Sequence, residues 1–434
     1  MPDKKGRKKE RPVEENRYCA AAGRETWKRK KAETIRETKN IKETKYIKKT
    51  KNIKETKCIM ATKETKKVSV IIPFYNGADY LEQCVEGLRK QTYPEIEMIL
   101  IDDGSTDGSE RLCERLAGQY SGIRVYHTKR LGVSAARNRG IEAAEGEYLT
   151  FVDVDDHPME GMIRYLVDLL EGTGSDVSGC DFVPFTSYPP VITDAEKPGI
   201  GECSNSTGQE QLGIGEYSNS PDQDPPETGE PFAGANSYGR ETWEILKGRE
   251  WIDRGILAGD TRCWSKLYKK EALSGIRFPE GMTIGEDMLF LLQLAIGGCS
   301  LSRGHYRGYG YFLNEKGAML QNFKDTYMDQ IACWKQALEI IEREYPECRT
   351  RVAAQLLVGV MLTVGKLTIL PDREREKKLM FRQKCSLVLQ EILPDREVLG
   401  QLDRGYRIKV RFFHRFPGLY MWLYGSLKRW RSGK

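Results

Sequence analysis

The stretch Phe151-Val152-Asp153-Val154-Asp155-Asp156 (FVDVDD) is an apolar strand pattern that ends in three carboxylates. Such a concentration of negative charge at a strand end is unfavourable unless a cation lies beside it. The hard divalent ions Mg²⁺ and Mn²⁺ prefer carboxylate oxygens, so a metal that carries a phosphate would neutralise these side chains. On these six residues alone, a solvated acidic turn after a buried strand explains the pattern equally well.

Apolar strand patterns alternate with amphipathic helix patterns in the residues before this stretch. The predicted elements are strands at 68–73 (VSVIIP), 96–101 (IEMILI), 123–127 and 148–152, and helices at 79–92, 109–120 and 132–144. This alternation predicts a doubly wound, parallel sheet. Ligands of such sheets bind at the carboxyl ends of the strands. Three polar loops fall at those ends, at Asn76, Asp102–Asp107 and Asp153–Asp156.

The pattern is interrupted at residues 186–240, which are rich in Gly, Ser, Pro and acidic residues. Such a segment cannot bury a core, so we expect a disordered insertion within the domain. Beyond residue 325 the chain is predicted to be helical. Residues 355–370 are apolar but short and broken by Lys366, which favours a core helix over a membrane span. The predicted domains are therefore 68–325 and a helical region at 326–434.

The first 67 residues form a basic tail, with 24 Lys and Arg against 10 Asp and Glu. The whole chain has a net charge of +6, so the remainder is net acidic and no nucleic-acid partner is expected. A hexad of the type ETKNIK recurs from Glu37, and one Ile per hexad cannot form a core, which predicts a disordered or loosely helical basic segment. The functional alternative for this segment is electrostatic attachment to an anionic membrane or to nucleic acid. Met60 begins MATKETKKVSVIIP, which resembles a natural start, so residues 1–59 are alternatively an over-extended reading frame.

Cysteine usage and hydropathy predict a cytoplasmic protein. The eleven cysteines form no CxxC pair, and no apolar signal peptide or run of about 18 apolar residues occurs. Residues 407–434 mix Arg and Lys with Phe, Tyr and Trp. This composition suits a packed amphipathic helix or peripheral association with the inner face of the cell membrane.

Two common nucleotide-binding fingerprints are missing from the sequence. No GxGxxG follows the first strand, and no GxxxxGK[ST] occurs. Carboxylates are the alternative nucleotide ligands. Asp102 or Asp103 can accept hydrogen bonds from a base or a ribose, while Asp153 and Asp155 can hold a metal that bridges a diphosphate.

Four motifs carry a resemblance to a known family. They are VSVIIPFYN at 68–76, DDGSTD at 102–107, GVSAARNRG at 132–140 and FVDVDD at 151–156. In this order they resemble the inverting family 2 glycosyltransferases with the GT-A fold, and WSKLY at 264–268 and GED at 285–287 resemble that family's acceptor-side elements. The resemblance spans roughly 68–320. It implies an α/β fold with a Rossmann-like, doubly wound mixed sheet. The helical C-terminal extension and the disordered basic tail lie outside the resemblance and are expected from the residue patterns alone.

The resemblance also implies roles for individual residues. The implied donor and nucleotide residues are Pro73, Tyr75, Asn76, Asp102, Asp103, Arg137, Asn138 and Asp153. The implied metal ligands are Asp155, Asp153 and Asp156. The implied acceptor-side residues are Trp264, Lys266 and Glu286. Asp287 is the implied catalytic base. Without the resemblance, Glu286 and Asp287 would be interpreted as acids at a helix start, and Trp264 as a core residue.

These roles imply an inverting transfer of a sugar from a nucleotide sugar, expected to be UDP-linked, to a hydroxyl acceptor. A sugar hydroxyl is a poor nucleophile, so a carboxylate must accept its proton, and Mn²⁺ or Mg²⁺ neutralises the departing diphosphate. The expected acceptors are glycans, lipid-linked sugars or other hydroxyl compounds of polysaccharide or glycolipid synthesis. The alternatives are a metal-dependent nucleotidyltransferase, which would not need Asp287, and a non-catalytic nucleotide-sugar-binding module.

Overall fold

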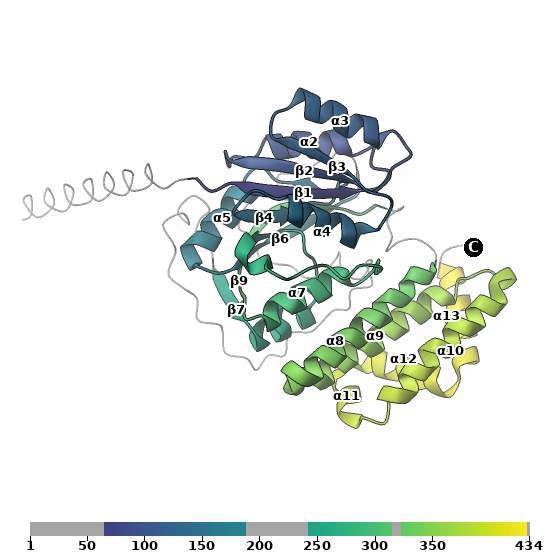
Figure 1. Cartoon of the computed structure of the whole chain (residues 1–434). Helices are drawn as coiled ribbons and strands as arrows, with labels where there is room; N and C mark the ends of the chain where they lie inside the picture. The colour runs from purple at the N-terminus through teal and green to yellow at the C-terminus, as the bar shows by residue number, and fades with distance from the viewer. Residues whose placement is uncertain (1–64, 188–241, 315–322, 432–434) are drawn as a thin grey trace, which may run out of the picture. The chain divides into compact units, whose positions relative to one another are not determined.

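The computed structural model describes residues 65–187, 242–314 and 323–431 (Figure 1). The described residues from 66 onward belong to one compact unit. The predicted tail at 1–67 and the predicted insertion at 186–240 fall almost entirely outside the described residues. The predicted domain boundaries stay predictions.

A nine-stranded mixed sheet forms the centre of the α/β part. Its strands are β1 (Val68–Phe74), β2 (Ile96–Asp102), β3 (Ile123–His127), β4 (Tyr148–Phe151), β5 (His157–Pro158), β6 (Val177–Phe185), β7 (Trp243–Lys247), β8 (Lys266–Lys269) and β9 (Ser300–Phe312). The order is β3-β2-β1-β4-β8-β6-β9-β5, and β7 pairs with β9. Strands β1 to β4 are parallel, whereas β8 is antiparallel to both β4 and β6. The predicted doubly wound mixed sheet is therefore confirmed.

The helices divide between the sheet and a C-terminal region. They are α2 (Leu81–Arg89), α3 (Ser109–Gln119), α4 (Val133–Ala143), α5 (Met162–Thr173), α7 (Glu286–Ile296), α8 (Asp329–Glu344), α9 (Arg349–Leu367), α10 (Arg375–Ile392), α11 (Arg396–Gln401), α12 (Arg404–Arg415) and α13 (Pro417–Arg431). A π-helical turn at Trp251–Gly255 and a 3₁₀ turn at Ile256–Ala258 lie between β7 and β8.

Strand β1 explains why the sheet is covered on both faces. All seven of its residues are buried. Val70 and Ile72 pack in one cluster with residues of α2, α3 and α5, while Ile71 packs in another with residues of α4 and α7. A parallel strand covered on both faces needs a continuous apolar run rather than an alternating one, and that run is what predicts β1 from the sequence.

Helix α4 lies close to β1 because residue 140 has no side chain. A Cβ atom at Gly140 would overlap Cγ2 of Ile71, which has no room to move in the core. We expect Gly140→Ala to lower the free energy of unfolding by about 1–3 kcal/mol, because overpacking outweighs the better helix propensity of Ala. Urea unfolding measures the change.

The matched control is Gly118→Ala in α3, where no atom lies within 4 Å of the added Cβ. This variant should be neutral or stabilised, since only the helix propensity changes. Equal losses in the two variants would contradict the close approach of α4 to β1.

Helix α9 is the centre of the helical C-terminal region, which Figure 1 shows as a group of long helices. It packs against α8, α10, α11, α12 and α13. The segment Pro346–Leu367 is long and apolar enough to span a membrane, but 78% of its apolar window is buried inside the structure. Packing on several sides accounts for this apolarity, in agreement with the core helix predicted at 355–370.

Candidate active site

The loops after β1 and β2 are tied together at the carboxyl edge of the sheet. The Oδ1 of Asn76 accepts a hydrogen bond from the backbone N–H of Thr106 (2.8 Å), and the N–H of Asn76 donates to the Oγ of Ser105 (2.9 Å). Asn76 has a left-handed backbone (φ 54°), which Asn adopts more readily than most residues. Pro73 is buried within β1. Asn76 therefore shapes the loop on which a nucleotide would lie.

Asp102 and Asp103 are buried, with 2% and 5% exposure. Asp102 accepts hydrogen bonds from the N–H of Ser105 and from the Nδ1 of His127, both at 2.9 Å. The Oδ1 of Asp103 accepts from the hydroxyl of Thr128 and the N–H of Leu131, and its Oδ2 accepts from the N–H of Gly132 (2.7 Å). Because Oδ2 has one such donor, it retains a lone pair for a base N–H.

An exposed aromatic ring lies in the same loop as Asn76. Tyr75 is 38% exposed, and the guanidinium carbon of Arg130 lies 4.3 Å from the centre of its ring. A flat ring with a cation against it suits stacking with a base and attraction of a phosphate. Arg130 is not among the predicted site residues, and nothing in its local sequence distinguishes it from other surface arginines.

Arg137 joins the predicted donor and acceptor sides. It lies in the first half of α4 and is only 3% exposed. Its Nη1 donates to the Oδ1 of Asp287 (2.7 Å) and the Oε1 of Glu286 (3.0 Å), and its Nη2 donates to the Oδ1 of Asp153 (3.1 Å). One guanidinium thus links two carboxylates at the start of α7 with the carboxylate at the end of β4.

The charges of this cluster do not balance. Burial disfavours a charged Arg137, but the carboxylates, Asp287 first among them, outweigh burial and raise its pKa well above the usual range. Burial raises the pKa of Asp153 despite Arg137, and it raises the pKa of Glu286 to about 8 with added repulsion from Asp287. A single cation therefore faces an excess of carboxylates, and a further cation would stabilise their ionised forms.

Asp287 lies in the first turn of α7, where acids favour a helix N-terminus. Its side chain does not cap the helix. The Oδ1 accepts from Arg137, and the Oδ2 accepts from the N–H of Cys263 (3.1 Å). A plain capping role therefore does not account for the position of this carboxylate, which is held by two donors beside the end of β4.

The three carboxylates after β4 have different surroundings. Both oxygens of Asp156 are engaged, by the hydroxyl of Tyr309 (2.7 Å) and the N–H of Phe312 (2.8 Å), so this residue anchors β9. The Oδ2 of Asp155 accepts from the side-chain amide of Asn314 (3.1 Å). Burial raises the pKa of Asp155. Of the three, Asp155 and Asp153 fit a metal better than Asp156 does.

The described residues contain no group of three or more His, Cys, Asp and Glu side chains able to hold a metal on its own. Mg²⁺ in phosphate-binding enzymes is usually held by one or two carboxylates together with phosphate oxygens of the substrate. Asp155 and the neighbouring Asp153 meet that requirement. The residues present therefore fit a divalent ion that binds together with a diphosphate.

The other predicted residues have mainly structural contacts. The amide of Asn138 both donates to and accepts from the backbone of Phe278, at 2.9 Å each. Trp264 is 5% exposed and stacks on Tyr309 at 4.6 Å. Lys266 is 2% exposed and pairs with Asp260 at 2.6 Å. The acceptor-side roles of Trp264 and Lys266 stay predictions, and both side chains would reach an acceptor only through their neighbours.

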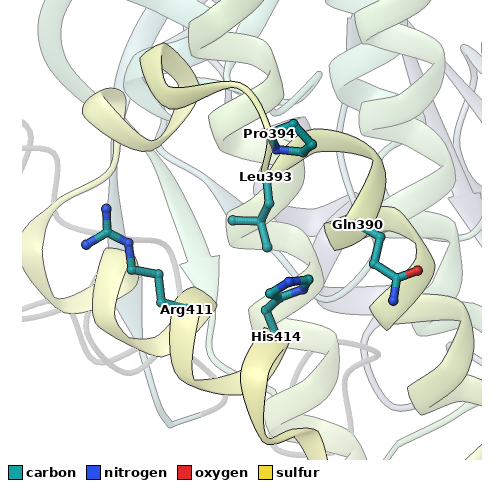
Figure 2. A pocket seen from close by; sticks show the side chains of 5 residues that line it. All are labelled: Gln390, Leu393, Pro394, Arg411 and His414. Atoms are coloured by element: carbon teal, nitrogen blue, oxygen red, sulfur yellow. The ribbon is translucent and has the colours of Figure 1, made fainter.

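An open hollow of about 400 Å³ lies in the C-terminal helices rather than at this site. Figure 2 shows the five residues that line it, which are Gln390, Leu393, Pro394, Arg411 and His414. None of them is a predicted site residue. The hollow is therefore separate from the carboxylate cluster at the sheet edge.

Comparisons with known proteins agree with the fold. The family model described as Glycosyl transferase family 2 matches residues 69–222. Glycosyltransferase GlyG of Streptococcus pneumoniae is 46% identical over 111 residues, which are 25% of this chain and 37% of GlyG. The minor teichoic acid biosynthesis protein GgaB of Bacillus subtilis is 30% identical over 222 residues, 50% of this chain and 20% of GgaB. The matches thus span well under half of the length of each of these relatives.

A solved structure shares the fold over most of the chain. The crystal structure of residues 1–349 of S. aureus TarS, in complex with UDP-GlcNAc, covers 85% of this chain and 92% of its own chain. The TM-score is 0.54 at 19% sequence identity. The arrangement of strands and helices is therefore shared with a GT-A-type structure.

Proposed function

We propose that this chain, which belongs to glycosyltransferase family 2, transfers a sugar from a UDP-sugar to a hydroxyl acceptor with inversion of the anomeric carbon. The observation that carries the proposal is the buried link made by Arg137 between Asp153 and Asp287. It places a donor-side carboxylate and a candidate base on one cation. The choice of UDP is supported by the similar fold of TarS, which was crystallised with UDP-GlcNAc.

The donor end of the site would be formed by four side chains. Tyr75 and the free lone pair of Asp103 would receive the base, and Asp155 with Asp153 would hold a divalent ion, Mg²⁺ or Mn²⁺. When bound, this ion neutralises the charge that develops on the departing diphosphate. Asp156 would act indirectly, because its bonds to Tyr309 and Phe312 fix the loop that carries Asp155.

The acceptor end would depend on Asp287. Each of its oxygens accepts one hydrogen bond in the described structure, so lone pairs remain to receive a hydroxyl proton. As that proton moves to Asp287, the acceptor oxygen attacks the anomeric carbon from the side opposite the diphosphate. One displacement of this kind inverts the configuration. Arg137 orients Asp287, and it disperses negative charge before the donor arrives.

The acceptors that we propose are glycans or lipid-linked sugars of polysaccharide or glycolipid synthesis, at the cytoplasmic face of the cell membrane. GgaB, which matches half of this chain, is named for teichoic acid biosynthesis. A charged nucleotide-sugar donor is consistent with a cytoplasmic reaction.

The metal assignment predicts the effect of Asp155→Asn. Loss of one of few protein ligands should weaken Mg²⁺-dependent binding of UDP by about 10- to 100-fold. Titration calorimetry of UDP with Mg²⁺, Mn²⁺ or a chelator measures this. The control is Asp79→Asn, which removes an exposed carboxylate from the neighbouring loop and should change nothing. Metal-independent UDP binding in the wild-type protein would contradict the assignment.

The same titration tests the donor. We expect UDP to bind more tightly than GDP or ADP, because the one lone pair left on Oδ2 of Asp103 matches the single N3–H of uracil. Guanine presents a second donor beside its N1–H, and adenine has no N–H at that ring position. If GDP binds more tightly than UDP, the UDP assignment is wrong, but the proposal of sugar transfer is not contradicted. If no nucleoside diphosphate binds with metal present, the proposed function fails.

A further inference from the structure

Helix α13 is apolar on two faces, and one of them is packed. Tyr420 and Met421 are buried, with 5% and 6% exposure. Tyr420 contacts the ring of Phe413 at a centroid distance of 5.6 Å and stacks on Tyr424 at 5.7 Å. The contact with Phe413 joins α13 to α12, and α13 also packs against α9. Packing therefore sets the orientation of α13 and determines which of its side chains lie on the opposite face.

The other face carries large apolar side chains that no described residue covers. Its members, which we call the α13 stripe, are Leu419 (48% exposed), Trp422 (63%), Leu423 (43%), Leu427 (48%) and Trp430 (78%). Their spacings of three and four residues place them on one side of a helix. A contiguous exposed apolar face of this kind marks an interaction site rather than ordinary surface.

The charge around the α13 stripe is positive. Residues 404–431 contain eight Lys and Arg and no Asp or Glu. On α12, Lys409, Arg411 and Arg415 are all exposed. Trp side chains bordered by basic residues match the boundary between lipid headgroups and acyl chains, where the ring is buried and the cations meet anionic headgroups.

We propose that the α13 stripe, with the basic side chains of α12, docks on an anionic lipid membrane. Two segments of the chain fit the stripe poorly as occupants. Residues 1–67 are themselves strongly basic, and residues 432–434 are too few to cover five large side chains. Charge complementarity favours an anionic surface over a second copy of this equally basic face. The proposal is independent of sugar transfer, because none of the site residues lies in α12 or α13.

Co-sedimentation with vesicles tests the proposal on the full chain. Vesicles of phosphatidylcholine with about one-third phosphatidylglycerol should bind the protein, and pure phosphatidylcholine should bind it at least about tenfold more weakly. Because the basic tail also attracts anionic lipid, binding is measured again in about 0.5 M salt, where electrostatic attraction is largely screened and apolar insertion remains.

The variant Trp422→Ser/Trp430→Ser should lose roughly tenfold or more of the salt-resistant binding. The matched control is Leu387→Ser, because Leu387 is 63% exposed but lies on α10. It should bind as the wild-type protein does. Far-UV circular dichroism checks that both variants fold, and UDP binding should be unchanged in both.

Three results would overturn the proposal. The first is no salt-resistant binding by the wild-type protein, and the second is equal binding by the Trp422→Ser/Trp430→Ser variant. The third is self-association in analytical ultracentrifugation that this variant abolishes without any vesicle binding, which would make a second copy the occupant. If the wild-type protein does not bind UDP, that result would contradict the proposed function but not the proposed membrane docking.

Discussion

Asp287→Asn is expected to slow sugar transfer by about 10³-fold, because general-base catalysis typically contributes 10²- to 10⁴-fold. Asn keeps the shape of the side chain, and its single carbonyl oxygen can still accept from Arg137. Its NH2 group replaces the oxygen that accepts from the N–H of Cys263, and the amide cannot take a proton. Donor binding should therefore remain unchanged. Steady-state release of UDP measures the rate, and titration calorimetry measures donor binding.

The neighbouring carboxylate supplies the matched control. Burial raises the pKa of Glu286 to about 8, so this side chain is largely protonated at pH 7. Gln resembles a protonated Glu, and Glu286→Gln should slow transfer less than about tenfold. Equal losses in Glu286→Gln and Asp287→Asn would show that both act by positioning. Loss of donor binding in Asp287→Asn would mean that the base assignment is wrong.

Arg137→Met is expected to lower the free energy of unfolding by about 3–5 kcal/mol at pH 7, because removal of one partner leaves buried carboxylates unpaired. Asp153, Glu286 and Asp287 all lose their shared donor. Urea unfolding measures the loss. Arg139→Met in the same helix is the control, because the side chains of the Arg139–Glu142 pair are about half exposed (47% and 54%). Loss of this pair should lower the free energy of unfolding by less than about 1 kcal/mol.

The pH dependence of the Arg137→Met loss distinguishes charge from packing. Burial already raises the pKa of Asp153 and Glu286, and the substitution raises both further. An acid whose pKa is higher in the folded state destabilises that state as pH rises above its unfolded pKa. The loss should therefore shrink near pH 4 and grow towards pH 8. A loss that is constant with pH would contradict the electrostatic account, and Arg137→Lys should restore part of the stability.

The parallel half of the sheet was predictable because each strand is a continuous apolar run. Strand β9 was not, since SLSRGHYRGYGYF is rich in Gly and Arg and has no clear apolar run. Its glycines instead allow close contacts, as at Gly310 against the backbone of His157. The mixed half of the sheet, in which β9 is parallel to β6 and antiparallel to β5 and β7, therefore depends on packing between distant segments. A local pattern does not reveal such packing.

The candidate site was predictable to a similar degree. The loops after β1, β2 and β4 meet at one edge because parallel strands place their carboxyl ends together. The link from Arg137 to Asp287 spans 150 residues and has no local signal. The engagement of Asp156 by Tyr309 likewise depends on the position of β9, so the acidic run alone could not rank its three carboxylates.

The most direct measurement is the fate of a UDP-α-linked sugar given to the wild-type protein with Mn²⁺ or Mg²⁺ and a panel of glycan and lipid-linked acceptors. We predict UDP release that an acceptor accelerates, together with a β-linked product identified by NMR. Retention of the α configuration would contradict the single displacement through Asp287. Release of the sugar 1-phosphate would indicate nucleotidyl transfer, and donor binding without turnover of any acceptor would contradict the catalytic account.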